Sequence, residues 1–201
     1  LTGRYGYRTG VGNVIASGNP GLSLDEWSIP RVLDANPGLG YSHACIGKWH
    51  VGPVGKKTHP NDMGFDYFSG LLVGGVQSYT DWKETTDGET ESNTQYATTR
   101  HVDQALAWLG AQESPWFLWL ALISPHTPVH LPPANLHTYS ELSGTQEDIE
   151  ANGTTYFRAM IQAMDTEIGR LLEGVGEEQL ENTVVIYVGD NGTSSTVIEA
   201  P

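Results

Sequence analysis

Three segments of the chain have the apolar content and the length of buried strands. Residues 41–49 mix apolar and small side chains, and residues 116–123 (WFLWLALI) are apolar on both faces, as a sheet covered by helices requires. A third run, TVVIYV at residues 183–188, leads directly into GDNG. The pattern therefore predicts three strands, of which residues 116–123 have the strongest signal.

Between these strands, apolar residues recur every three or four positions, which is typical of helices packed on one side. This spacing predicts helices at about residues 94–112 and 154–173. A shorter helix is expected at about residues 29–35, capped by Ser28, because Pro30 is tolerated only in the first turn of a helix. Strand and helix alternate along the chain, which predicts an α/β sandwich.

Composition and charge narrow the class of protein. The 201 residues are 38% hydrophobic, and no apolar run approaches the roughly 18 residues that cross a bilayer. A net charge of −14 with only 10 Lys and Arg argues against nucleic acid or an anionic membrane as partner. The single cysteine, Cys45, excludes an internal disulfide framework, and the polar residues 80–93 are expected to form a surface loop. An anionic substrate would need a local positive site.

Such a positive site is suggested by IGKWHVG, residues 46–52. Alternate side chains of a strand share a face, so Lys48 and His50 are expected to point the same way and Trp49 the opposite way. Lysine suits an oxyanion, and histidine suits proton transfer near neutral pH. The simpler interpretation is a solvated lysine beside a hydrogen-bonded histidine at a strand end.

A second candidate is the run SPHTP at residues 124–128, which directly follows the most apolar strand. In a mainly parallel sheet, this places His126 beyond the carboxyl end of a strand, where ligands of open α/β sheets bind. A loop histidine fixed by packing is the alternative. His130 follows four residues later, but the prolines argue against a helix that would bring both imidazoles to one metal, so His130 is interpreted as a pocket wall.

The third candidate is GDNG at residues 189–192. Asp190 and Asn191 offer the hard oxygen ligands that suit calcium or magnesium, although an ordinary turn has the same composition. The spaced acidic ligands of an EF-hand are missing. Three strand-end segments would thus bring together a lysine, two histidines and half of a metal site in an acidic protein, a set that suits an anionic ester.

Five segments, in order along the chain, resemble elements of the sulfatases of the alkaline phosphatase superfamily. Residues 1–11 (LTGRYGYRTGV) are similar to the segment after the family's C/S-x-P-S-R nucleophile motif. Residues 41–52 resemble G-Y-x-T-x-x-x-G-K-W-H-x-G, and residues 125–128 match P-H-x-P. Residues 156–172 resemble the helix that ends in D-x-x-I-G-R-L-L, and residues 185–192 match the D-N-G metal loop.

The resemblance implies a fold and a role for each candidate residue. The fold would be an alkaline phosphatase-like α/β sandwich, with a mixed, largely parallel sheet between helices. Lys48 and His126 would bind the sulfate, and His126 would help to protonate the leaving oxygen. His50 would hydrogen-bond the nucleophile and help to expel sulfate from the covalent intermediate. Asp190 and Asn191 would supply half of a Ca²⁺ site, with Mg²⁺ or Mn²⁺ as the other ions considered.

The chain also departs from the family pattern. The nucleophile, a cysteine or serine converted to formylglycine, would precede Leu1, and Cys45 cannot replace it because CIGK is not C-x-P-S-R. The family's Asp-Asp pair and a downstream lysine are missing too, while Arg4 is expected to support the nucleophile's helix. We therefore expect residues 1–201 to be part of a sulfatase catalytic domain that alone neither turns over substrate nor binds calcium tightly. A missing first strand would leave the sheet incomplete, with an edge that favours self-association.

The resulting hypothesis is a sulfuric ester hydrolase that acts on an aryl sulfate or a sulfated carbohydrate. One alternative is a phosphonate monoester or phosphodiester hydrolase of the same superfamily, because it would share the lysine, the histidines and the metal loop. Another is a non-catalytic binding or scaffold protein. Substrate specificity is expected to come from residues 70–93 and 130–145, and family precedent suggests a secreted, periplasmic or lysosomal protein.

Overall fold

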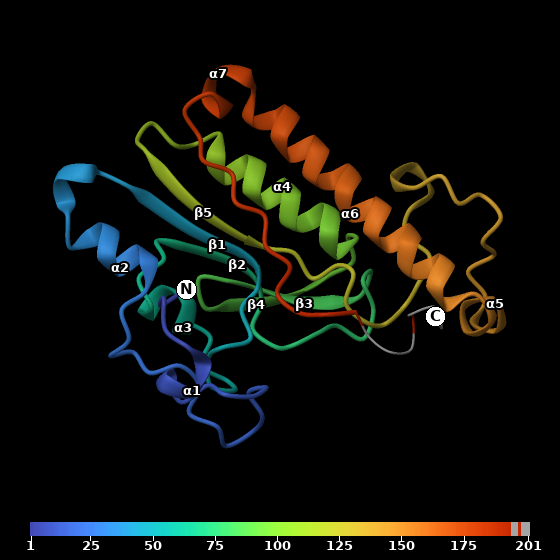
Figure 1. Ribbon diagram of the computed structural model, residues 1–201, viewed down its shortest axis with the longest axis horizontal. Coiled ribbons are helices and arrows are strands. Elements are labelled where there is room, and N and C mark those ends of the chain that lie inside the picture. The colour runs from blue at the N-terminus through green and yellow to red at the C-terminus, as the bar shows by residue number, and fades with distance from the viewer. Residues whose placement is uncertain (194–196, 198–201) are drawn as a thin grey trace. The chain divides into compact units, whose positions relative to one another are not determined.

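The computed structural model describes residues 1–193 and residue 197. The chain divides into two compact units, Leu1–Ile123 and Ser124–Pro201. The first unit holds the sheet and the second is mainly helical (Figure 1).

The sheet of the first unit is mixed and has the strand order β4-β3-β2-β1-β5. Strand β1 lies parallel to both β2 and β5, whereas the pairings of β2 with β3 and of β3 with β4 are antiparallel. The strands span Ser42–Lys48 (β1), Tyr67–Leu71 (β2), Trp82–Thr86 (β3), Glu89–Asn93 (β4) and Trp116–Ala121 (β5). The α/β fold class is therefore confirmed, with three neighbouring parallel strands and an antiparallel hairpin at one side.

The hairpin formed by β3 and β4 corrects the expected surface loop at residues 80–93. Its turn is Asp87-Gly88, and both residues have positive φ angles, 45° and 91°. Asp-Gly is a favoured pair for such a two-residue turn because it tolerates the left-handed backbone that matches the strand twist. The sequence gives no apolar pattern for these strands, because β4 is largely exposed and its side chains are polar.

In the first unit, one long helix covers the sheet and the other helices are short. Ser28 caps α2, Ile29–Asp34, by accepting a hydrogen bond from the Arg31 backbone N–H (3.3 Å), and Pro30 lies in the first turn, as expected. Helix α4, Ala97–Leu109, covers the sheet by contacting β1, β2 and β5 (Figure 1). The remaining helical segments are short: α1 (Gly6–Thr9), η1 (Pro37–Leu39) and α3 (His59–Asp62).

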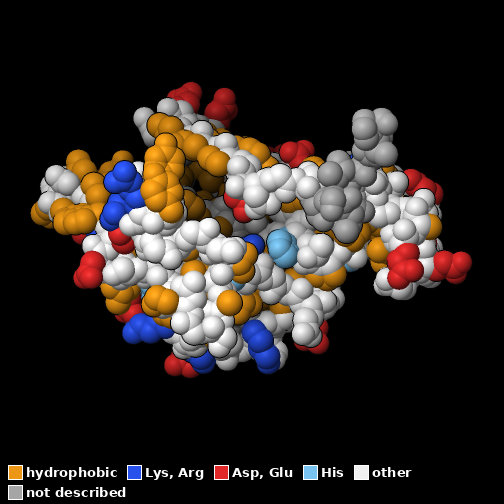
Figure 2. Space-filling view, turned by 60° about the horizontal axis from the view of Figure 1, so that its bottom comes forward, with side chains coloured by type: hydrophobic (Ala, Val, Ile, Leu, Met, Phe, Trp, Pro, Cys, Tyr) orange, Lys and Arg blue, Asp and Glu red, His pale blue; other side chains and the backbone are white. Residues whose placement is uncertain are grey.

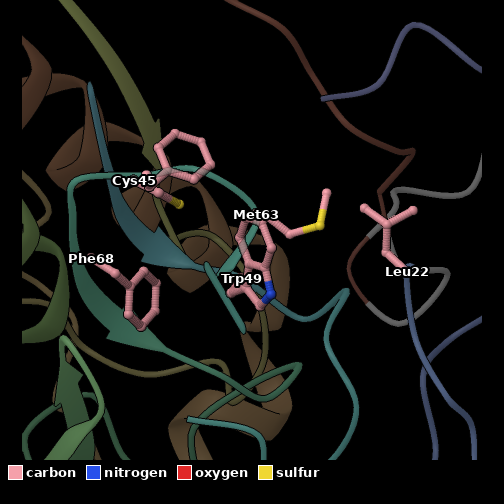
Figure 3. Packing of buried hydrophobic residues seen from close by; sticks show 6 residues of the cluster. Leu22, Cys45, Trp49, Met63 and Phe68 are labelled. Atoms are coloured by element: carbon pink, nitrogen blue, oxygen red, sulfur yellow. The ribbon is translucent and has the colours of Figure 1, made fainter. Parts of the chain in front are cut away.

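A buried hydrophobic cluster lies beside β1 and β2 in the first unit. It comprises Leu22, Cys45, Trp49, Met63, Phe65 and Phe68 (Figure 3). The Phe65 ring meets Trp49 edge-on, with 5.9 Å between ring centroids. Burial raises the pKa of the Cys45 thiol, which keeps it protonated and unreactive.

The second unit is built around one long helix, α6, Gly153–Val175, which confirms the helix expected at residues 154–173. Its buried face includes Tyr156, whose hydroxyl donates to Asp148 Oδ2 (2.6 Å). The other helical segments are η2 (Ala134–Leu136), α5 (Gln146–Ala151) and α7 (Glu177–Leu180). None of the described helices combines the length and apolar content that crossing a membrane requires.

The strand predicted at residues 183–188 is wrong. The segment has no strand assignment, and Val184 to Val188 expose between 61% and 86% of their surface. A strand needs a neighbour for its backbone hydrogen bonds, and this segment pairs with no strand in the described part of the chain. Elsewhere too, hydrophobic side chains reach the surface among scattered charged groups (Figure 2), as is normal for a folded domain.

Candidate functional site

Lys48 is the last residue of β1, the middle one of the three parallel strands. It is half-buried and pairs in register with Leu71 of β2. The residue before it, Gly47, has φ 107°, and an added Cβ there would lie only 2.6 Å from the Ala121 carbonyl carbon of β5. Position 47 therefore has no room for a side chain. Lys48 lies at the carboxyl edge of the parallel strands, where ligands bind in open α/β sheets.

His50 does not continue the strand, which corrects the argument that alternation alone places it on the same face as Lys48. Strand β1 ends at Lys48, and His50 has φ 42°, in the left-handed region. The Trp49 N–H still donates to the Leu71 carbonyl oxygen of β2 (2.8 Å), so the backbone leaves the sheet only after Trp49. Histidine tolerates this region better than most residues, and such conformations cluster at functional sites.

Trp49, between the two candidates, points into the core as expected and is 7% exposed. Its indole N–H donates to His59 Nδ1 (3.1 Å), and His59 Nε2 lies 2.9 Å from the Leu22 carbonyl oxygen. Since Nδ1 accepts, the proton of His59 must sit on Nε2, where it donates to Leu22. Burial lowers the pKa of His59, which favours this neutral form. His59 therefore fixes Trp49, a role that no spacing in the sequence signalled.

His126 lies on an exposed loop of the second unit. The loop is fixed to α6 at its start, because Ser124 Oγ donates to the Met160 carbonyl oxygen (3.3 Å). His126 Nδ1 lies 2.9 Å from the Thr127 carbonyl oxygen, and a proton on Nδ1 can donate to it. In that tautomer, Nε2 carries the lone pair of the ring.

His130 lies apart from any helix, as the prolines led us to expect. Its Nδ1 lies 2.9 Å from the Pro128 carbonyl oxygen, and burial lowers the pKa of His130. A neutral imidazole is a suitable wall for a pocket, and that interpretation stays a prediction.

Asp190 and Asn191 are exposed in the second unit. Asn191 Nδ2 donates to the Gly192 carbonyl oxygen (3.0 Å), which leaves Oδ1 as its metal-ligating atom. The carboxylate and amide oxygens fit a hard cation in kind. Within residues 1–193 and residue 197, no group of three or more His, Cys, Asp or Glu is arranged to hold a metal. Each unit thus carries part of the candidate set, two residues in the first and three in the second.

Comparison with known proteins decides the family. The sequence profile described as Sulfatase matches residues 1–197. The chain belongs to the sulfatase family. It is 30% identical to arylsulfatase J of Mus musculus over 98% of its length, and 30% identical to arylsulfatase G of Homo sapiens over 96%. It covers 34% and 41% of those two proteins, so it spans roughly a third to two-fifths of the length of these relatives.

A solved structure shares the fold of this chain. The crystal structure of Ps i-CgsB in complex with k-i-k-neocarrahexaose is similar over 90% of this chain and 44% of that one, with a TM-score of 0.73 and 25% identity. The resemblance to sulfatases is therefore confirmed, and the sulfatase family generally uses a formylglycine nucleophile and a divalent metal.

Proposed function

We propose that the intact protein hydrolyses sulfuric esters, with Lys48, His50 and His126 as its catalytic residues and residues 1–201 as part of its catalytic domain. The observation that carries the proposal is the match to the sulfatase family over residues 1–197. That match does not favour a phosphonate or phosphodiester hydrolase, or a scaffold without activity.

Lys48 is proposed to bind the sulfate group. Its position at the carboxyl end of β1, where ligands of open α/β sheets bind, supports this role. There the lysine would provide a local positive charge in a chain whose net charge is −14. An ammonium group beside the sulfate oxygens would stabilise the negative charge that develops on them as the ester bond breaks.

His126 is proposed to protonate the leaving oxygen. The contact between Nδ1 and the Thr127 carbonyl oxygen supports this role, because it orients the ring and directs proton exchange to Nε2. A protonated Nε2 would donate to the ester oxygen, so that an alcohol leaves rather than an alkoxide. His50, two residues after Lys48, is proposed to hydrogen-bond the nucleophile.

Asp190 and Asn191 are proposed to contribute oxygen ligands to a divalent cation, for which Ca²⁺ is the first candidate. When bound, the cation would neutralise charge on the sulfate oxygens, and formylglycine would supply the nucleophile. For the substrate we propose a sulfated carbohydrate or an aryl sulfate. The complex of Ps i-CgsB with k-i-k-neocarrahexaose supports the carbohydrate.

The test is p-nitrophenyl sulfate hydrolysis by the intact protein and by its Lys48→Ala and His126→Ala variants. Each substitution is expected to lower kcat/KM by about 100-fold or more, because each removes a charge or a proton donor from the transition state. Lys57→Ala is the matched control, since Lys57 is exposed in the same unit. Retention of wild-type kcat/KM by both site variants would refute the assigned roles.

A further inference from the structure

The segment between β2 and β3, residues 72–78, is fixed at both ends. At its start, the Leu71 carbonyl oxygen accepts the Trp49 N–H (2.8 Å), which joins the end of β2 to the backbone beside His50. At its end, Tyr79 is 3% exposed, and its hydroxyl lies 3.3 Å from the Ile123 carbonyl oxygen. The segment therefore has little freedom to move away from His50.

Within this segment, Gly74 packs directly on the His50 imidazole. An ideal Cβ built on Gly74 would lie 2.6 Å from His50 Nδ1 and 2.9 Å from Nε2, and nearer still to Cε1. Such distances are shorter than any non-bonded carbon–nitrogen contact, so the ring and a side chain at position 74 cannot occupy these places together.

We propose that Gly74 is a positioning residue for His50, and that its lack of a side chain sets where the imidazole lies. The catalytic consequence rests on the proposed function of His50. With a side chain at position 74, the imidazole would move, because a ring at the far end of a side chain shifts more easily than a backbone segment that is held at both ends. His50 has little compensating backbone freedom, since its φ of 42° already lies in a sparsely populated region.

A displaced imidazole would slow turnover more than it would weaken binding. Sulfate binding is proposed for Lys48, which belongs to β1 and precedes the backbone turn at His50, so KM is expected to change little. A misplacement of about 1 Å in a catalytic group can lower the rate by about 100-fold. Gly74→Ala is therefore expected to lower kcat by about 10- to 100-fold, with KM within about threefold of the wild type.

The experiment compares Gly74→Ala with Gly38→Ala in the intact protein. Gly38 is the matched control, because an added Cβ there meets nothing within 4 Å. The ring Cε1–H NMR signal of His50, assigned with His50→Gln in histidine-labelled protein, should shift in Gly74→Ala and stay unchanged in Gly38→Ala. An unchanged signal in Gly74→Ala would overturn the packing, and a shifted signal with wild-type kcat would overturn the positioning role.

A double-mutant cycle covers a variant that folds poorly. Gly74→Ala should lower the unfolding midpoint in the wild-type background and lower it clearly less in a His50→Ala background, where the ring is gone. Equal losses in both backgrounds would contradict the proposed contact. If the wild-type protein lacks sulfatase activity, the proposed function fails, while the NMR signal and the cycle still decide whether Gly74 positions His50.

Discussion

At the scale of single residues, the buried His101 is expected to make the stability of the protein sensitive to acid. Its ring meets Trp82 edge-on, 5.5 Å between centroids, and neither ring nitrogen has a hydrogen-bond partner in the described part of the chain. Burial lowers the pKa of His101 from 6.5 to about 4, against an opposing effect of Glu84, and Arg100 lowers it further. The unfolded chain takes up the proton near pH 6.5 and the folded protein only near pH 4, so stability is complete above pH 6.5 and falls as the pH drops to 4.

We expect His101→Phe to remove this acid sensitivity, because the apolar ring has no proton to take up. The wild type should lose about 3 kcal/mol of unfolding free energy through this group between pH 7 and pH 4. Urea unfolding at several pH values measures the loss, with the exposed His126→Phe as the control. A His101→Phe variant with the wild-type pH dependence would show that another group is responsible.

The candidate residues show which local features a sequence can reveal. Trp49 was expected to point away from Lys48 and is buried, because strand alternation holds up to the end of β1. The backbone at His50 was not predictable in this way, since its positive φ accompanies a hydrogen bond from Trp49 to Leu71, a residue distant in sequence. The contact between Gly74 and the His50 ring also joins residues that are distant in sequence, so the spacing of residues did not indicate it.

At the scale of secondary-structure elements, a buried ion pair connects β3 to α4. Glu84 is fully buried, and both of its oxygens lie 3.0 Å from Arg100 Nε. Ser69 Oγ and Asn93 Nδ2 also donate to the carboxylate, at 3.0 and 2.7 Å. The pair therefore fixes the hairpin to the helix that covers the sheet.

Arg100→Ala should destabilise the protein by about 3–5 kcal/mol, because it leaves the buried Glu84 carboxylate without its countercharge. The double variant Glu84→Gln/Arg100→Ala should lose less, since no charge then remains buried. Urea unfolding measures both variants, and the exposed neighbour Lys83→Ala should change stability by less than about 0.5 kcal/mol. If Arg100→Ala proves as mild as Lys83→Ala, the pair does not hold α4 to the hairpin.

Periodicity identified some elements and missed others for physical reasons. The three-to-four spacing of α6 reflects its buried face, which the sequence displays directly. The apolar run at residues 116–123 predicts the strand β5 but not its burial, because every residue of β5 is at least partly exposed. The β3–β4 hairpin was missed because its side chains are polar, although Asp87-Gly88 was an available turn signal. Residues 183–188 were apolar enough for a strand, but strand formation depends on a pairing partner that composition does not reveal.

At the scale of the whole molecule, the candidate residues come from both compact units. Lys48 and His50 belong to Leu1–Ile123, whereas His126, Asp190 and Asn191 belong to Ser124–Pro201. Hydrophobic patterning predicted the α/β class, and a common role for residues so far apart in the sequence was suggested by their places after predicted strands and by the order of their motifs. The chain belongs to the sulfatase family, and the common role of these residues stays a prediction.

The central claim is that the intact protein prefers sulfuric esters. The most direct measurement is kcat/KM for p-nitrophenyl sulfate beside p-nitrophenyl phosphate and a p-nitrophenyl phosphonate ester, with Ca²⁺ present and the nucleophile in its formylglycine form. We expect kcat/KM for the sulfate to be higher by about 100-fold or more, equivalent to about 3 kcal/mol of preferential transition-state binding. A preference for the phosphonate or phosphate ester, or no hydrolysis of any of the three, would contradict it.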